Sequence, residues 1–403
     1  TVGNTSPGVA GTDYPDPAGG DSFVVAASHV LTIPAGLTVT AQGELLDGSE
    51  GSETELIVNG TYNFETDEFW MADYGKLTIG PNGIIDLNGL NLDLNPSANI
   101  DSFLNFQGTS RSAMGTLRNT GAAAGMIQGN SGRVHCDIDY AYVGEGMTSV
   151  VLSDTYFGDV SSEIDHLVMD CSSLTSDPKI IDKGTETNSS FRLANSDFRD
   201  CPAARKLYIT CYGSQTSATR VFKDCTFSNS GGVEGTLIIR VADFTEFENL
   251  VLNDFFAWAY NGLTTLDKVL IKNDEGSDGK AISGSSSNYF DITNSAIISE
   301  KLNAHMLIQG WRNATGNVIE SHDEQSDMAM FDGRDHSISQ NIFLGAGCAS
   351  MCNERADYPH NAEFFQNTLV LSRGQLGMML LTEGAGTVLT GTNRYHSNII
   401  IDT

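Results

Sequence analysis

Four stretches of the chain decide its fold: Asn317-Val-Ile319, Asn341-Ile-Phe343, Asn367-Thr-Leu-Val370 and Asn398-Ile-Ile-Ile401. Each one places an asparagine at the start of a short apolar run. Polar residues at positions 224, 249, 268 and 294 open similar runs, so the pattern recurs at intervals of roughly two dozen residues. A repeat of this length, without helical periodicity, is typical of a solenoid in which each repeat forms one coil.

A second short apolar segment lies between successive members of this series, at residues 207–211, 237–241, 256–260, 281–283, 306–308, 328–331, 350–352 and 378–381. One coil cannot bury its own apolar side chains, but coils stacked about 4.8 Å apart bury them together. We therefore predict an all-β chain that forms a right-handed, single-stranded parallel β-helix, or β-solenoid. Asparagines at the same turn of successive coils are expected to form a side-chain amide ladder, with simple turn preference as the alternative explanation.

The strands that Asn or Asp opens in residues 131–403 resemble those of the pectate-lyase-like right-handed parallel β-helix superfamily. That superfamily contains pectin and alginate lyases, polygalacturonases, phage tailspikes and surface adhesins, so the resemblance implies a fold and leaves the function open. Residues 21–130 alternate apolar and polar side chains between Gly turns and are predicted to be tighter coils of the same solenoid. Residues 1–20 contain Pro7, Pro15 and Pro17 and are predicted to be an extended arm.

The charge of the chain limits its partners. The 403 residues include 22 Lys and Arg against 51 Asp and Glu, which gives a formal net charge of −29. Nucleic acid needs a basic surface, and a membrane span needs ~20 consecutive apolar residues, so we expect neither partner. An acidic surface keeps a protein soluble, and together with the solenoid pattern it favours an extracellular location on a cell or virion surface.

The candidate binding flank is marked by Arg312, Arg334 and Arg355, which follow the second segment of consecutive repeats at nearly equal spacing. This spacing predicts a column of guanidinium groups, which bind carboxylates and hydroxyls well. Ion pairing of each arginine with a nearby acid is the alternative. The full candidate carbohydrate-binding set adds Tyr260, Trp311, Asp332, Asn353, His336 and His360.

Two functions follow from this flank. The first is a structural, adhesive or receptor-binding surface protein, such as a tailspike or adhesin, that engages carbohydrate. The alternative is a polysaccharide lyase or glycoside hydrolase acting on a uronate-containing polymer in the same groove. A lyase needs a base and a cation, and a hydrolase needs two carboxylates. The motifs of polygalacturonases and pectate lyases are not evident, so no catalytic residue is assigned.

Smaller features add further expectations. Cys201 and Cys225 are about one repeat apart and Cys348 and Cys352 are a close pair, so each pair is a candidate disulfide, with buried free thiols as the alternative. Calcium is a candidate cofactor.

The calcium candidates are Asp274 and Asp278, with a second oxygen-rich segment at Asp137-Ile-Asp139, and a solvated turn is the alternative for both. The last strand, at residues 398–402, would expose apolar rows. We therefore expect a further protein segment or a second copy of the chain to cover it.

Overall fold

The computed structural model consists of β-strands joined by turns, and none of the residues that it describes lies in a helix. The chain divides into two compact units: unit 1 is residues 1–199 with 210–219, and unit 2 is residues 200–209 with 220–403. In some strands the description covers the backbone alone. The described residues are 23–25, 28–41, 44–65, 69–94, 100–123, 125–129, 133–152, 162–182, 191–211, 220–230, 235–241, 246–260, 264–273, 282–284, 290–299, 308–309, 311–321, 327–332, 335–345, 348–353, 361–371, 378–382 and 394–402.

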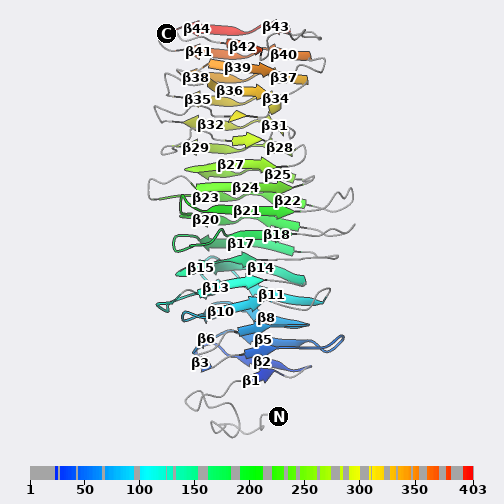
Figure 1. The fold of residues 1–403 in the computed structure, drawn as a ribbon, viewed down its shortest axis with the longest axis vertical. Helices are drawn as coiled ribbons and strands as arrows, with labels where there is room; N and C mark the ends of the chain where they lie inside the picture. Colours follow the sequence, from blue (N-terminus) through cyan, green and yellow to red (C-terminus); the bar gives the residue numbers. More distant parts are fainter. Residues whose placement is uncertain are drawn as a thin grey trace. The chain divides into compact units, whose positions relative to one another are not determined.

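Each unit is a parallel β-solenoid, which confirms the predicted fold class (Figure 1). A typical coil has a first and a second strand joined by a tight corner, and a third strand that returns to the next coil. The boundary that the sequence predicts near residue 130, between the tighter coils and the later coils, falls inside unit 1. Strand β11, before this boundary, pairs with strand β14, after it. The predicted arm at residues 1–20 lies outside the described residues.

The strands of unit 1 form three rows. The first strands are β2 (Val30–Ile33), β5 (Thr54–Val58), β8 (Gly75–Ile79), β11 (Asp101–Gln107), β14 (Arg133–Val143), β17 (Ser162–Asp170) and β19 (Phe191–Ala194). The second strands are β3 (Thr38–Ala41), β6 (Thr61–Phe64), β9 (Ile84–Asp86), β12 (Gly115–Arg118), the later parts of β14 and β17, and β20 (Asp197–Arg199). The third strands are β1 (Phe23–Val25), β4 (Glu44–Leu46), β7 (Phe69–Met71), β10 (Asn91–Leu94), β13 (Gly125–Gly129), β15 (Met147–Ser149), β16 (Val151–Leu152) and β18 (Lys179–Asp182).

The strands of unit 2 repeat this plan. The first strands are β22 (Arg220–Lys223), β25 (Glu246–Glu248), β28 (Thr264–Asp267), β31 (Phe290–Thr293), β34 (Trp311–Thr315), β37 (Asp335–Ser339), β40 (Asn361–Phe365) and β43 (Arg394–His396). The second strands are β23 (Thr226–Ser228), β26 (Val251–Asn253), β29 (Leu270–Asn273), β32 (Ala296–Ser299), β35 (Val318–Ser321), β38 (Ile342–Gly345), β41 (Thr368–Leu371) and β44 (Ile399–Asp402). The third strands are β21 (Lys206–Cys211), most of which lies in unit 2, β24 (Gly235–Val241), β27 (Phe255–Tyr260), β30 (Ile282–Gly284), β33 (Ile308–Gln309), β36 (Asp327–Asp332), β39 (Cys348–Asn353) and β42 (Met378–Thr382).

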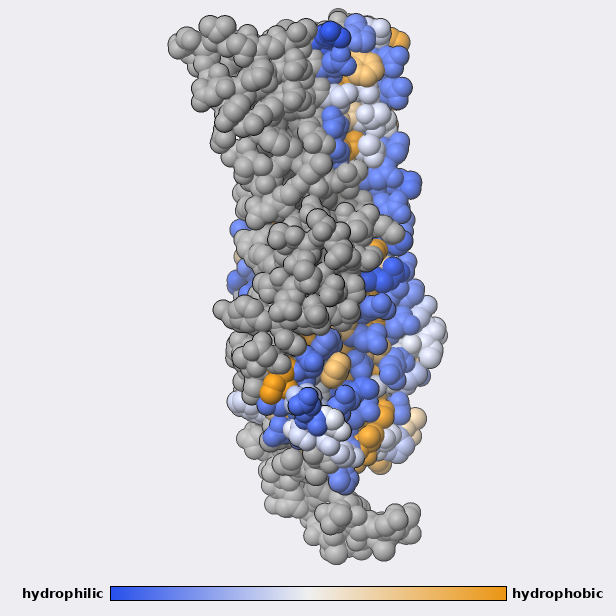
Figure 2. Space-filling view, turned by 90° about the vertical axis from the view of Figure 1, so that its right-hand side faces the viewer, coloured by the Kyte–Doolittle hydropathy of each residue, from blue (hydrophilic) through white to orange (hydrophobic). Residues whose placement is uncertain are grey.

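The core lies inside the coils. Alternate side chains of each strand point inward, and parallel pairing in register stacks them into columns. In unit 1 one column runs through Leu56, Leu77, Leu104 and Cys136, all 0% exposed. The other side chains of the strands face outward. The described residues that Figure 2 shows in colour are mainly hydrophilic, with separate apolar spots.

The predicted asparagine ladder forms in unit 2. Asn317, Asn341 and Asn367 are at most 1% exposed, and the Oδ1 of each later asparagine accepts both the backbone N–H and the Nδ2–H of the one before it. Asn398 continues the series in the same way. Each Nδ2 of the first three also donates to a carbonyl of the first strand of the preceding coil. The ladder therefore satisfies buried polar groups at every corner that it reaches.

The ladder and the polar positions at 224, 249, 268 and 294 do not belong to one row, contrary to the sequence series. Asp224, Asn249, Lys268 and Asn294 have φ between +50° and +56° and are the first residues of their corners. Their successors are inward, and only from residue 317 onward is the inward residue an asparagine. Gly316, Gln340, Gln366 and Ser397 are the true equivalents of the earlier four. Left-handed backbone favours Asn and Asp, which explains why two structural roles share one sequence signal.

Candidate functional site

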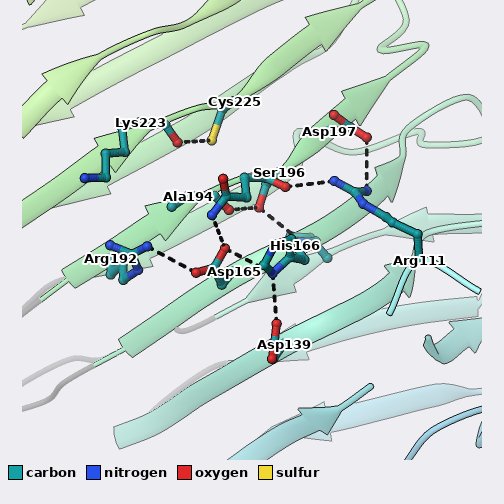
Figure 3. A network of polar contacts seen from close by, with 12 residues as sticks. Arg111, Asp139, Asp165, His166, Arg192, Ala194, Ser196, Asp197, Lys223 and Cys225 are labelled. Carbon is teal, nitrogen blue, oxygen red and sulfur yellow. Dashed lines mark hydrogen bonds and ion pairs between the residues drawn. The ribbon is translucent and has the colours of Figure 1, made fainter. Parts of the chain in front are cut away.

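An outward-facing polar cluster of unit 1 is the corner ridge, which we define as Arg111, Asp139, Tyr140, Asp165, His166, Arg192, Asn195, Asp197 and Arg199. Figure 3 shows Arg111, Asp139, Asp165, His166, Arg192 and Asp197 of this ridge. Its corner residues Tyr140, His166 and Asn195 follow one another in successive coils with φ of +48°, +52° and +50°. A left-handed residue at the corner turns its side chain outward, so the three side chains lie along the outside of the solenoid. The rings of Tyr140 and His166 stack with centroids 4.1 Å apart and planes 6° apart.

His166 is held at its Nδ1 atom by two carboxylates. Asp139 Oδ1 lies 3.0 Å from Nδ1 and Asp165 Oδ1 lies 3.3 Å away, and the side chain of His166 is 29% exposed. The register explains this, because Asp139 pairs directly with Asp165 and both stand immediately before their corners. No described residue hydrogen-bonds to Nε2 of His166. The imidazole is therefore oriented from one side and able to meet a ligand at the other.

Two residues of the next coil donate hydrogen bonds to the second carboxylate, that of Asp165. Asn195 Nδ2 donates to Asp165 Oδ1 at 2.7 Å, and Arg192 donates to Asp165 Oδ2 at 3.1 Å. Both oxygens of Asp165 therefore have donors, and its side chain is only 25% exposed. Asp139 is the more open of the pair, with 53% of its side chain exposed.

Arg111 crosses the ridge from a loop distant in sequence. Its NH1 donates to Asp197 Oδ2 at 3.0 Å and its NH2 donates to the carbonyl of Asn195 at 2.9 Å. The loop follows β11, and β14, β17 and β19 come next in the stack, so the loop and the side chain of Arg111 together reach across about 14 Å along the solenoid. Arg199 also donates to Asp197, at 3.3 Å.

The ridge is balanced in charge, unlike the chain as a whole. The ridge holds three arginines and three carboxylates. Arg111 and Arg199 contact Asp197, Arg192 contacts Asp165, and Asp139 contacts His166, while the full sequence carries a formal charge of −29. Acidic and neutral polymers therefore meet less repulsion here than elsewhere. Among the described residues no group of three or more His, Cys, Asp or Glu is placed to hold a metal ion.

Next to the ridge, Tyr142 lies on the same strand as Tyr140 and donates from its hydroxyl to Asp170 Oδ2 at 3.2 Å. Burial, followed by the negative charges of Asp170 and Glu145, raises the pKa of Tyr142 to about 12. The phenol therefore stays protonated near neutral pH and acts as a hydrogen-bond donor there.

The predicted arginine flank falls largely outside the described residues. Arg334, Arg355 and His360 are not described, nor are the calcium candidates Asp274 and Asp278. Trp311 and Arg312 lie in β34 and His336 in β37, with only their backbones described. The flank therefore stays a prediction.

The backbone adds some detail to that flank. The register between β31 and β34 shifts between Phe290–Trp311 and Asp291–Asn313, which makes Arg312 the extra residue of a bulge. Asp332 and Asn353 end the third strands β36 and β39, and Tyr260 ends β27. Tyr260 therefore belongs to a third strand, whereas Trp311 begins a first strand, so the two are not at equivalent places in the coil.

The structure favours the alternative of buried free thiols for Cys201 and Cys225, and the strand that holds Cys348 and Cys352 argues against a bond between them. Cys201 and Cys225 are buried free thiols, because Cys201 follows a second strand whereas Cys225 stands in the corner before one. Cys348 and Cys352 lie on the single strand β39. Residues four apart in a strand are about 13 Å apart, well beyond the ~7 Å limit for a disulfide.

Sequence reasoning missed the corner ridge as a site, although it named Asp139 as part of an oxygen-rich segment. The sequence does contain a signal for this ridge. Asp137-Ile-Asp-Tyr140 and Glu163-Ile-Asp-His166 lie one coil length apart, and each ends in an aspartate followed by an aromatic residue. That pair would have placed Tyr140 on His166. The approach of Arg111 had no such signal, because it depends on the path of a loop.

Comparison with known proteins identifies no family for this chain. No protein-family model matches the chain, and no curated protein matches it. Among solved structures, a PL6 family alginate lyase, AlyGC, aligns with 95% of this chain and 97% of its own, at 10% identity and a TM-score of 0.19. A TM-score of that size does not support a shared function or a shared site. Among the described residues, no helix is long and apolar enough to cross a membrane.

Proposed function

We propose that the protein binds an extended glycan along the corner ridge of unit 1. The observation that carries this proposal is the Tyr140–His166 ring pair, set in a charge-balanced row of donors and acceptors that continues over successive coils. A glycan needs apolar ring surface together with directional hydrogen bonds, and fixed carboxylates and guanidinium groups supply the latter at low entropic cost. A Cβ at Gly108, in the preceding coil, would lie 2.2 Å from the carbonyl oxygen of Tyr140, so glycine allows the close approach of the two coils at this corner.

The test is glycan binding by calorimetry, with a panel of neutral glucans, pectate and alginate. The informative variants are Tyr140→Asn and His166→Asn, because asparagine tolerates the positive φ of both corners. A matched control is Gln340→Asn, at an exposed corner of unit 2 with φ +59°. We expect at least a tenfold loss of affinity for the two ridge variants and none for the control. Wild-type affinity in both ridge variants, or no binding to the panel, would contradict the proposal.

A polysaccharide lyase is the second candidate, and the orientation of His166 favours it. In a β-elimination, Nε2 would take the C5 proton of a uronate, the electron pair would form the C4–C5 double bond, and the C4–O bond would break, with its oxygen taking a proton from solvent. A nearby guanidinium such as Arg192 would face the uronate carboxylate. Asp139 would orient the ring, as a positioning residue.

The lyase is tested by the ultraviolet absorbance of unsaturated uronate products. Activity that is lost in His166→Asn and reduced mainly in kcat in Asp139→Asn supports elimination at the ridge. Glycan binding without any such absorbance supports binding alone.

A further inference from the structure

Unit 1 carries a second ring stack that is built like the Tyr140–His166 pair. The rings of Phe103 in β11 and His135 in β14 stack with centroids 4.8 Å apart and planes 16° apart. Both stacks join an aromatic residue of one coil to a histidine of the next coil. In both, an aspartate carboxylate lies at the imidazole, and at His135 it is Asp101, whose Oδ1 is 3.3 Å from Nε2. The same construction therefore occurs twice on neighbouring coils.

Strand β14 connects the two stacks, because it holds His135 near its start and Tyr140 at its corner. Alternate residues of a strand face the same side, so the outward side chains between the stacks line one surface. We call them the linking strip: Asn105 and Gln107 in β11, and their register partners Asp137 and Asp139 in β14. The residues that alternate with them fill the core and are at most 1% exposed: Leu104, Phe106, Cys136 and Ile138. The strip is about 13 Å long, at ~3.3 Å per residue from His135 to the last outward residue before the corner.

The linking strip offers hydrogen-bond acceptors and contains no lysine or arginine. Gln107, Asp137 and Asp139 are exposed, and only Asn105 is buried. The register partner of Asp137 in the following coil is Glu163, which is also exposed, so two carboxylates stand side by side. No described residue forms a hydrogen bond or an ion pair with either of them. Like charges directly opposite each other destabilise a sheet, so strand pairing does not account for this pair.

The nearby basic residues stand outside the linking strip. Lys76 lies in the preceding coil and pairs with Glu55 at 3.4 Å. Arg192 lies beyond the following coil and donates to Asp165 at 3.1 Å, and Arg133 stands at the start of β14. A ligand between the two stacks therefore meets carboxylates. Hydroxyl and ammonium groups can donate hydrogen bonds to these carboxylates, whereas a carboxylate on the ligand would be repelled.

We propose that one extended glycan occupies both ring stacks and the linking strip between them, and that this glycan carries hydroxyl or ammonium groups and no carboxylates. This inference rests on the proposed glycan binding at the corner ridge and adds to it a second subsite, a direction and a substrate class. The glycan leaves the ridge at Tyr140–His166 and continues along β14 to Phe103–His135. The rings supply apolar surface, the acceptors between them orient the donor groups of the sugar, and repulsion by the strip rejects polyuronates.

The experiment is calorimetry with three hexasaccharides of equal length: a neutral glucan, an oligomer of glucosamine and an oligomer of galacturonate. We expect the galacturonate oligomer to bind at least tenfold more weakly than the better of the other two. The comparison of those two separates hydroxyl recognition from ammonium recognition.

The second subsite is tested by Phe103→Thr, which keeps a strand-forming residue at an outward position. This variant should weaken binding of the preferred hexasaccharide at least fivefold. The matched control is Phe365→Thr, which breaks a similar stack in unit 2, where the rings of Phe365 and His396 have centroids 5.3 Å apart. The control should bind like wild type, and circular dichroism would show that both variants keep the wild-type strands.

The substrate class is tested by Asp137→Lys, which replaces a carboxylate of the linking strip by an ammonium group. We expect the affinity for the galacturonate oligomer to rise at least fivefold and the affinity for the glucosamine oligomer to fall by a similar factor. Unchanged affinities for both oligomers would overturn the assigned role of the strip.

The variant Tyr140→Asn separates this inference from the proposed function. If Tyr140→Asn weakens binding while Phe103→Thr matches its control, the ridge binds glycan and the second subsite is wrong. Galacturonate binding as tight as that of the other two oligomers, with the same loss in Tyr140→Asn, overturns the substrate class and leaves the ridge as the binding site. If none of the three oligomers binds, or if Tyr140→Asn binds like wild type, the proposed function fails and this inference fails with it.

Discussion

Replacing Asn341 by alanine tests whether the amide ladder holds unit 2 together. Asn341 is 1% exposed, and its Oδ1 accepts from Asn317 N at 3.0 Å and from Asn317 Nδ2 at 2.8 Å. Its Nδ2 donates to the carbonyl of Ala314 at 2.9 Å and to Asn367 Oδ1 at 3.0 Å. Alanine removes all four of these hydrogen bonds.

The cost follows from which groups lose their partner. Asn317 Nδ2 keeps the carbonyl of Ile292, and Asn367 Oδ1 keeps the backbone N–H of residue 341. The buried N–H of Asn317 and the carbonyl of Ala314 lose the side-chain partner, at roughly 1–3 kcal/mol each. Water that enters the vacated space offsets part of this, so we expect a loss of about 3 kcal/mol.

The assay is urea unfolding followed by circular dichroism, together with hydrogen exchange of the strands β34 and β35. Exchange is needed because a solenoid opens locally and each coil depends on its neighbours. Gln340→Asn is the control, since Gln340 is exposed and asparagine accepts its φ of +59°. We expect the control to stay within about 0.5 kcal/mol of wild type. An alanine variant as stable as the control, or unchanged exchange in β34 and β35, would refute the reasoning.

Three further predictions concern unit 1. Burial works to raise the pKa of Asp86. Hydrogen bonds outweigh this effect and lower the pKa below its ordinary value of 3.8; they come from the backbone and hydroxyl of Thr120, the backbone of Asn88 and the guanidinium of Arg118. The ionised carboxylate therefore stabilises the fold above that pH, and this contribution is lost as the pH falls below it. The difference in unfolding free energy between wild type and Asp86→Asn should be about 1–3 kcal/mol at pH 7 and should shrink in acid. Ultraviolet titration should show one phenol ionising near pH 12 that is missing in Tyr142→Phe, and an ordinary tyrosine pKa there would contradict the assigned contact with Asp170. Gly144→Ala should lower the unfolding free energy by more than about 3 kcal/mol, because the φ of Gly144 is +110° and a Cβ would lie 2.2 Å from the Asp170 carbonyl oxygen. Gly36→Ala, with φ +79° and open space around it, should lower the unfolding free energy by only about 1 kcal/mol. Equal melting temperatures of the two variants would exclude this explanation.

The corner ridge shows the limit of reading sites from a sequence. The predicted arginine column relied on equal spacing along the chain, yet loops of different length lie between the strands, so equal spacing does not ensure an equal place in the coil. The extra residue at Arg312 is an example. The Tyr140–His166 pair, in contrast, follows directly from strand register, because both residues stand at the same corner of paired strands.

The sequence by itself determined the solenoid, since apolar residues that alternate in short strands can be buried only between stacked coils, and it determined the inward asparagines from Asn317 to Asn398. Tertiary structure decided which polar residues are the outward corner residues and which belong to the ladder, and that Cys201 and Cys225 stay apart. It also decided that Arg111 meets Asp197, 86 residues away. The physical reason is that inward packing repeats with a fixed local period, whereas outward contacts depend on loop paths and on strand register, which a count along the chain does not fix.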